Sequence, residues 1–396
     1  AIQALRERDE RAAHLLEDLK EPQWRELGGP PPAEQPQLAA SRAHCMYRRV
    51  LRTRRADFPG LLPQRQYRPI LVEPTEAEVE RQRLVWRFLA SLGEDSATNP
   101  ALLGRRALLG PASLRPRLGE LRRAGRDPGG ALREVEPLLS PDLGDSRLDE
   151  LVDLLAEIWR QDPAEQVLVV AHDNPTIDHL LKIVPARLPL VGPRADRRPL
   201  SVACVRGQTD AVKDLAAFKH ETNEHLSRFT DGEAQVLFAA DIAQVGLNLQ
   251  CARILVLYSI PWEPQEVEQW IGRLDRIGNS AIQAAGGLRP VEVYTVVQRG
   301  MVDASIANVL DHFQVFSHGV NLDSDNLERL SELLCRAALK PHSVSWTKLE
   351  QAAAQMAEDD RAGEFTSPLR PLLPWDAAFA GRVLEEIKAL PVVQPT

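Results

Sequence analysis

The sequence lacks the patterns that mark several common protein classes. Its four cysteines contain no Cys-x-x-Cys pair, which argues against a zinc site and favours buried thiols in a reducing compartment. No apolar run approaches the roughly 18 residues of a membrane span. Charged residues interrupt the first apolar positions, so no secretory signal is recognised. We therefore expect a cytoplasmic protein without membrane association.

The chain also lacks an excess of positive charge. Its net charge of −8 argues against a protein that coats nucleic acid by bulk charge, but does not exclude a local patch that grips a few phosphates. The sequence contains neither a Gly-x-x-x-x-Gly-Lys-Ser/Thr loop nor an Asp-Glu-x-His string. Such motifs bind nucleotide phosphates and Mg²⁺, so the chain has no phosphate-binding loop of its own.

What the chain does have is a central series of short apolar segments. Its 396 residues exceed the size at which single cores stop growing, so more than one module is expected. Apolar strands that alternate with helices predict a parallel sheet covered on both faces. We therefore expect an α/β fold with a doubly wound sheet over residues 145–300. The predicted strands are residues 166–171, 201–205, 235–240, 252–260 and 291–297.

The flanking regions differ from this centre. Residues 1–58 are expected to form a helical, basic connector, and residues 59–144 a helical region rich in arginine. Residues 301–396 are expected to form a helical extension. The basic stretches either touch nucleic acid or form a solvated surface, and both interpretations remain open.

Two positions carry signals for the start of a helix. Ser146 is a predicted N-cap, and Asp149 lies favourably in the first turn of the same helix. Asn174 is the second predicted N-cap, because Pro175 fits the first helical turn, where its missing N–H costs nothing.

Two segments beyond the strand ends carry polar groups, and ligands of open parallel sheets bind beyond the carboxyl ends of the strands. The first segment is residues 241–250. Gly246 allows close approach to the backbone, and Asn248 is a polar group inside an apolar run. An ordinary turn with a hydrogen-bonded Asn explains this segment equally well.

The second segment is a helix predicted over residues 264–278. Arg273 and Arg276 are three residues apart, so they are expected to share one helix face. Planar guanidinium groups match phosphate oxygens, which favours a polyphosphate ligand. The alternative is a solvated basic face in which the arginines pair with Glu268 and Asp275.

Gly272 lies inside this predicted helix. Glycine there costs roughly 1 kcal/mol relative to alanine. That cost indicates that another group packs close to the backbone at this position.

Five segments, in order, resemble one family of proteins. The string EQWIGRLDRIG (residues 268–278) resembles the last motif of superfamily-two helicases, Q-x-x-G-R-x-x-R-x-G. The other matching segments are residues 46–65, 167–180, 202–210 with Phe218, and 236–264. Together they resemble the C-terminal, second RecA-like lobe of an SWI/SNF-like helicase. The closest resemblance is to bacterial RapA-type ATPases that associate with RNA polymerase.

The resemblance implies a role for each matched residue. Arg273 and Arg276 would be arginine fingers that stabilise charge on the γ-phosphate of ATP held by another lobe. The residues implied to face the nucleotide are Gly246, Asn248, Gln269 and Gly272. The residues implied to contact nucleic acid are His172, Asp173, Asn174, Arg206, Gly207 and Asp241.

The implied function is the second motor lobe of a DNA-dependent ATPase that translocates on double-stranded DNA. ATP and Mg²⁺ would be bound mainly by a missing first RecA-like lobe, upstream in the native chain or on another subunit, so this chain alone is expected to be inactive. RNA polymerase and a genome-defence complex are both compatible partners. A non-catalytic module that keeps the fold and binds nucleic acid or protein remains the alternative.

Two departures from the family pattern stand out. Ala240 occupies a position where many relatives have a Ser or Thr that contacts phosphate, and this weakens the expected DNA contact of that loop. Asn279 replaces the Gln that usually follows the last glycine of the final motif.

Overall fold

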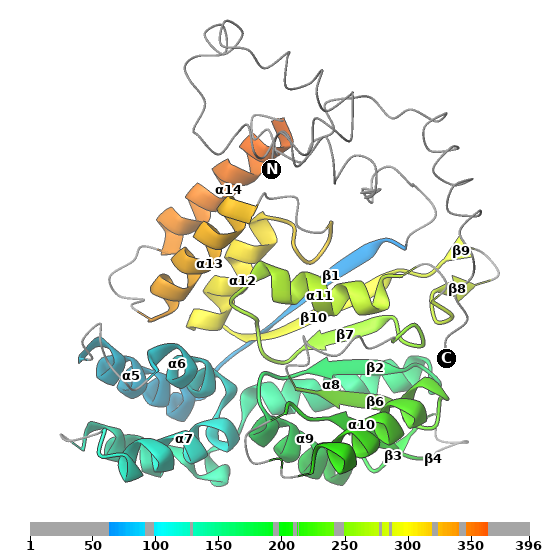
Figure 1. The fold of residues 1–396 in the computed structure, drawn as a ribbon, viewed down its shortest axis with the longest axis horizontal. Helices are drawn as coiled ribbons and strands as arrows, with labels where there is room; N and C mark the ends of the chain where they lie inside the picture. The colour runs from blue at the N-terminus through cyan, green and yellow to red at the C-terminus, as the bar shows by residue number, and fades with distance from the viewer. Residues whose placement is uncertain are drawn as a thin grey trace, which may run out of the picture. The chain divides into compact units, whose positions relative to one another are not determined.

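A six-stranded, wholly parallel sheet organises the chain in its computed structural model (Figure 1). The strand order is β1-β10-β7-β2-β6-β5. The predicted strands are all present, and the expected α/β fold with a parallel sheet is confirmed. The strands are β1 (Arg65–Val72), β2 (Val167–Val170), β5 (Val202–Val205), β6 (Val236–Ala239), β7 (Ile254–Leu257) and β10 (Val291–Gln298).

The structure describes residues 63–91, 99–126, 130–192, 198–208, 212, 214–240, 249–276, 279–284, 287–318, 324–339 and 346–362. All of them belong to one unit, residues 58–365. The predicted connector at residues 1–58 lies outside the described residues, as do Asp241, Gly246 and Asn248.

The strand β1 was not expected, because the sequence predicts only helices between residues 59 and 144. The structure corrects this: β1 pairs with β10 along its whole length, from Arg65 opposite Val291 to Val72 opposite Gln298. As an edge strand it is half exposed, and its one apolar run, Ile70 to Val72, is short and follows Pro69, so the sequence does not mark it as a strand. The sheet therefore begins before the Arg-rich helices.

Helices follow β1 before the chain returns to the sheet. Fully buried leucines, including Leu103, Leu114 and Leu121, join them into one core. Trp86 donates a hydrogen bond from Nε1 to the Ala338 carbonyl at 2.7 Å, which ties this region to a C-terminal helix. The helices are α5 (Glu76–Ser91), α6 (Pro100–Leu109) and α7 (Pro111–Arg123), followed by the 3₁₀ segments η3 (Ala131–Leu139) and η4 (Pro141–Leu143).

Helices cover both faces of the sheet, as the alternation of side chains along β2 shows. Val167 and Val169 pack in one core, with α8 (Ser146–Gln161) and α9 (Asn174–Arg187). Leu168 and Val170 pack in the other core. Because successive side chains of a strand point to opposite faces, one apolar run supplies both cores. The helices of the second core are α10 (Leu215–Thr230), α11 (Pro264–Leu274) and α12 (Val302–His312).

The remaining elements are short hairpins and the C-terminal helices. The hairpins are β3 (Leu190–Val191) with β4 (Arg198–Pro199), and β8 (Gln283–Ala284) with β9 (Gly287–Leu288). The helices α12, α13 (Ser324–Leu339) and α14 (Trp346–Ala362) lie in the predicted helical extension at residues 301–396 (Figure 1). No helix in the described ranges is long and apolar enough to cross a membrane.

Both predicted helix caps are shifted by one residue. Asp145, not Ser146, caps α8, because its Oδ1 accepts a hydrogen bond from the Leu148 N–H at 3.1 Å. Asp173, not Asn174, caps α9. In each case the preceding carboxylate accepts the free N–H groups of the first turn and also complements the helix dipole.

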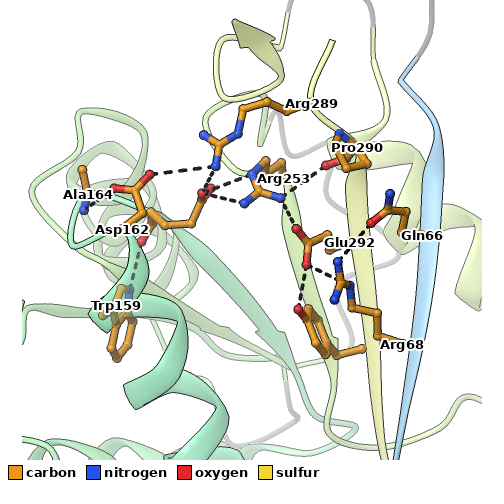
Figure 2. Close-up of polar contacts among 11 residues, drawn as sticks. Gln66, Arg68, Trp159, Asp162, Ala164, Arg253, Arg289, Pro290 and Glu292 are labelled. Atoms are coloured by element: carbon orange, nitrogen blue, oxygen red, sulfur yellow. Dashed lines mark hydrogen bonds and ion pairs between the residues drawn. The ribbon is translucent and has the colours of Figure 1, made fainter.

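A network of charged side chains closes the amino edge of the sheet (Figure 2). Arg253, just before β7, donates to Glu165 at 2.9 Å and to Glu292 of β10. Arg289 also donates to Glu165, and Arg68 of β1 pairs with Glu292 at 3.1 Å. The network joins β1, β10 and the start of β7 to Glu165, two residues before β2, and so holds together this end of the sheet.

Candidate functional site

The predicted site residues fall into two groups at opposite edges of the sheet. The loop 172–174 follows β2 and lies at the carboxyl edge. The helix α11 starts after β7 and runs back along the sheet for about 16 Å, as its 11 residues require. Asn279, beyond this helix, donates a hydrogen bond to the carbonyl of Ala252 at the amino edge, at 2.8 Å. The prediction that Arg273 and Arg276 lie at the carboxyl edge is therefore wrong.

The helix α11 ends before the second arginine. Asp275 leaves the helical conformation at ψ 65°, and the backbone N–H of Arg276 bonds to the Leu274 carbonyl at 3.0 Å. The Nε of Arg276 donates instead to the carbonyl of Gly272 at 2.9 Å. This side chain thus satisfies a carbonyl that the shortened helix leaves open. The prediction of a helix that extends to residue 278 is wrong.

The two arginines also lie in different surroundings. Arg273 is buried, with 6% of its surface exposed, and its guanidinium carbon lies 5.0 Å from the ring centroid of Trp270. Arg276 is exposed, and the bond to Gly272 is the one hydrogen bond its side chain makes to the described residues. The arginines do not share a helix face. Of the two, Arg276 presents its terminal nitrogens outward.

Gln269, Gly272 and Arg276 form an exposed face at this end of α11. Gln269 and Gly272 are three residues apart on the helix, and the Arg276 side chain, from beyond it, reaches back to the Gly272 carbonyl; both Gln269 and Arg276 are exposed. A Cβ at Gly272 would meet no atom within 4 Å. The described residues therefore do not supply the close packing that the sequence predicts at Gly272, and the backbone there is open to a ligand.

The acidic neighbours of these arginines are held by a residue from another strand. Arg65 of β1 donates to both oxygens of Glu268, each at 2.8 Å, and its Nε donates to Asp275 at 2.7 Å. Its side chain is 4% exposed. Burial alone would lower the pKa of Arg65, but the two carboxylates keep it above the ordinary value. No acidic side chain among the described residues pairs with Arg276, so the alternative of a basic face neutralised by Glu268 and Asp275 is not realised at this residue.

At the carboxyl edge, the structure brings together two of the predicted nucleic-acid segments. Asn174 donates from Nδ2 to the Gly207 carbonyl at 2.9 Å and accepts from the Gly207 N–H at 2.8 Å. This pair of bonds joins the loop after β2 to the loop after β5. Asp173 accepts from Ser113 and from the N–H of Thr176, so its carboxylate is engaged in capping α9 and in contact with α7.

Arg206 is paired with acidic groups. It lies 2.9 Å from Asp178 of α9 and 3.3 Å from Glu221 of α10. Although burial opposes it, these partners raise the pKa of Arg206 above its ordinary value. A phosphate at this position would have to compete with both carboxylates.

A pocket beside this loop contains residues that the sequence did not single out. Arg105 of α6 lies over the ring of Trp262, at 5.1 Å from the centroid, and within 3.9 Å of Glu266. The pocket is also lined by His172, one of the predicted nucleic-acid residues, and by Trp270. In the sequence, this pocket is signalled only by the Arg-rich pattern of α6 and by the Pro-Trp-x-Pro turn at residues 261–264. Neither pattern shows that α6 and this turn lie against each other.

Arg147 also lines this pocket, and acceptors surround its guanidinium group. It donates to the carbonyls of Leu108 and Tyr258 at 2.9 and 2.7 Å, and it lies 3.5 Å from Asp303. Burial raises the pKa of Asp303, and Arg147 opposes this. The cluster joins α6 to α8 and α12. Within the described residues, no group of His, Cys, Asp and Glu side chains is placed to hold a metal ion.

Comparison with known proteins identifies the central part of the chain. Residues 146–278 match the family described as helicase conserved C-terminal domain. The uncharacterized ATP-dependent helicase YqhH of Bacillus subtilis is 24% identical over 171 residues, which are 43% of this chain and 28% of that protein. The RNA polymerase-associated protein RapA of Vibrio atlanticus is 37% identical over 81 residues, which are 20% of this chain and 8% of that protein. The chain thus spans less than a third of the length of these relatives.

Two solved structures are similar at low sequence identity. The C-terminal part of the Fun30 ATPase domain is 14% identical, with a TM-score of 0.43 over 70% of this chain and 97% of that one. The Sulfolobus solfataricus SWI2/SNF2 ATPase core in complex with dsDNA is 14% identical, with a TM-score of 0.41 over 72% of this chain and 48% of that one. Residues 146–278 thus match the conserved C-terminal domain of helicases, and the six-stranded parallel sheet gives this part of the chain a RecA-like fold.

Proposed function

We propose that this chain is the second motor lobe of a DNA-dependent ATPase that translocates on double-stranded DNA, and that Arg276 is its arginine finger. The observation that carries the proposal is the exposed face of Gln269, Gly272 and Arg276. There a guanidinium without an acidic partner among the described residues stands beside open backbone.

This face fits the end of a nucleotide triphosphate. The terminal nitrogens of Arg276 provide donors and a positive charge, and Gly272 leaves room for close approach. Helicase-family ATPases use ATP and Mg²⁺: ATP supplies the γ-phosphoryl group that is transferred to water, and Mg²⁺ would neutralise negative charge on the phosphates. Both would be bound mainly by a first RecA-like lobe, in the same native chain or on another subunit. In enzymes of phosphoryl transfer, an arginine finger is worth about 10³ to 10⁵ in rate.

Arg273 has a different proposed part in this site. It directly follows Gly272 in the helix, and its buried guanidinium lies against the ring of Trp270. It would add positive charge beneath the site without touching the phosphate. Gln269 would orient the nucleotide or the finger from the exposed side.

Duplex DNA is the proposed nucleic-acid partner at the carboxyl edge. His172, the loop at Gly207 and Asp241 would contact a phosphate strand, while Gly246 and Asn248 are proposed to face the nucleotide. Asn174 would act by joining two of these loops, because its side chain is engaged with Gly207. RNA polymerase is a proposed protein partner only because the Vibrio relatives are named for that association.

The test measures ATP hydrolysis by the motor assembled from this chain and the lobe that carries the phosphate loop, with and without duplex DNA. We expect R276A to reduce the DNA-stimulated kcat by about 10³-fold or more. The matched control is R83A, which removes an exposed arginine of α5 that pairs with Glu80. The chain alone should not hydrolyse ATP above background.

Two outcomes would contradict the proposal. If R276A hydrolyses ATP at the rate of R83A, Arg276 is not a finger. If the chain binds duplex DNA but never stimulates hydrolysis in the presence of the first lobe, the chain is a non-catalytic binding module that kept the fold.

A further inference from the structure

We infer that Arg65 is a positioning residue for the turn that carries Arg276, so that the first strand of the sheet sets the place of the finger. The inference rests on the proposed function of Arg276. It concerns a residue more than 200 positions away in the chain, outside the helicase domain match at residues 146–278.

Arg65 has the geometry of a clamp. Three of its donors reach two carboxylates, with two parallel bonds to Glu268 at 2.8 Å and one to Asp275 at 2.7 Å. Glu268 lies within α11 and Asp275 lies directly after it, so one guanidinium holds both the last turns of the helix and the residue at which the chain leaves it. Bidentate pairs of this kind are strong and fix orientation as well as distance.

Arg65 is itself held in place by the sheet. It is the first residue of β1, opposite Val291 in the pairing with β10. The N–H of Val291 bonds to the Gln64 carbonyl at 2.9 Å, so the backbone on both sides of Arg65 is fixed. Because Arg65 belongs to a paired strand, its contacts fix α11 relative to the sheet and do not merely join two loops.

The other end of the turn is anchored separately. Asn279 is 1% exposed, and it donates to the carbonyls of Ala252 and Leu274 at 2.8 and 2.6 Å. Its Oδ1 accepts from the N–H of Ala281 at 2.9 Å. Arg276 thus directly follows Asp275, which Arg65 holds, and Asn279 is held separately at the amino edge of the sheet.

The clamp also affects the charge around the finger. Glu268 and Asp275 lie on either side of Gly272 in the sequence, and either could draw the Arg276 guanidinium away from a phosphate. Arg65 pairs with both carboxylates and so offsets part of their combined negative charge; its side chain is buried, so water screens these interactions little. Without Arg65, we expect Arg276 to turn toward the carboxylates.

Hydrogen exchange in the 396-residue chain tests the clamp without any need for activity. We expect R65Q to raise backbone exchange several-fold in peptides that cover residues 271–284, while peptides of β2 and β6 keep their protection. The matched control is R68Q: Arg68 lies in the same strand but pairs with Glu292 of β10 and is 51% exposed. If R65Q and R68Q change residues 271–284 equally, the clamp does not hold the turn.

The ATPase of the assembled motor tests the consequence. A misplaced finger lowers the rate of the chemical step, and displacement by about 1 Å can cost about 10²-fold. We therefore expect R65Q to lower kcat about 10- to 100-fold with the KM for ATP changed less than about twofold. R68Q should stay near the wild type.

A second variant guards against loss of folding in R65Q. E268Q removes one charge at a partly exposed position and should lower kcat less than R65Q. The double variant R65Q/E268Q should be no slower than R65Q, because both act through one contact. If R276A abolishes hydrolysis while R65Q matches R68Q, the positioning role is wrong and the finger stands. If R276A retains full hydrolysis, the proposed function fails, and the positioning role fails with it.

Discussion

Replacing Arg147 with methionine would remove the only positive charge that the structure places within 4.0 Å of Asp303 among the described residues. It would also take away the donors to the carbonyls of Leu108 and Tyr258, which lie in a buried region. Methionine fills much of the same volume. The loss is therefore one of charge and hydrogen bonds, and the buried carboxylate is left without its counter-ion.

The expected magnitude follows from this burial. Removing one partner of a buried ion pair costs about 3–5 kcal/mol, because the other charge stays desolvated. We expect R147M to lower the free energy of unfolding by an amount in that range near neutral pH. Arg187 of α9 pairs with Asp149 of α8, the helix that carries Arg147; this pair lies at the surface, at 2.5 Å, and the Arg187 side chain is 40% exposed. The control R187M should cost no more than about 1 kcal/mol.

The pH dependence has a definite sign. Burial raises the folded-state pKa of Asp303 above its ordinary value, so its contribution to stability is fully present below the unfolded pKa and is lost as pH rises through the folded pKa. Without Arg147, the folded pKa rises further. The destabilisation by R147M should therefore be larger at about pH 8 than at about pH 5.

Urea unfolding, followed by tryptophan fluorescence, measures the free energy of unfolding of R147M at about pH 5 and about pH 8, with R187M and D303N measured in parallel. D303N removes the carboxylate charge, so the R147M/D303N double variant should be more stable than R147M at the higher pH. If R147M is within about 0.5 kcal/mol of the wild type, or is more destabilised at the lower pH, the buried cluster does not have the role derived from its geometry.

Two further predictions concern the proposed binding surfaces. G272A should leave stability unchanged or raise it by up to about 1 kcal/mol, because a Cβ meets no atom there, yet it should lower the kcat of the assembled motor. Thermal unfolding and ATPase assays separate the two effects, and an unaltered kcat would exclude close approach of a ligand to Gly272. N174A should cost about 1–2 kcal/mol through its two lost bonds to Gly207 and weaken duplex binding in fluorescence anisotropy. N174D loses only the donated bond, so its stability and its affinity for the duplex should lie between those of the wild type and N174A. Equal affinity in the wild type, N174A and N174D would exclude a role for the joined loops in DNA binding.

Much of the fold could be predicted because its signals are local. The strands β2, β6 and β7 are buried at every residue, so each appears in the sequence as a short apolar run. Arg273 and Arg276 could be singled out because the string EQWIGRLDRIG around them resembles the last helicase motif. The edge strand β1 is half exposed and contains Pro69, and it could not be recognised in the same way.

The sequence by itself determined the parallel sheet, the helices around it and the segment that carries Arg276, because hydrophobic period and helix-breaking residues act over a few positions. Only the tertiary structure decided which charges meet. Arg65 is 203 residues from Glu268 and 210 from Asp275, and no local pattern links residues so far apart. It also decided that α11 runs back along the sheet and ends at Leu274, so that Arg276 is exposed while Arg273 is buried. Such pairings depend on which helices and strands are neighbours, and this is set by the packing of the complete core.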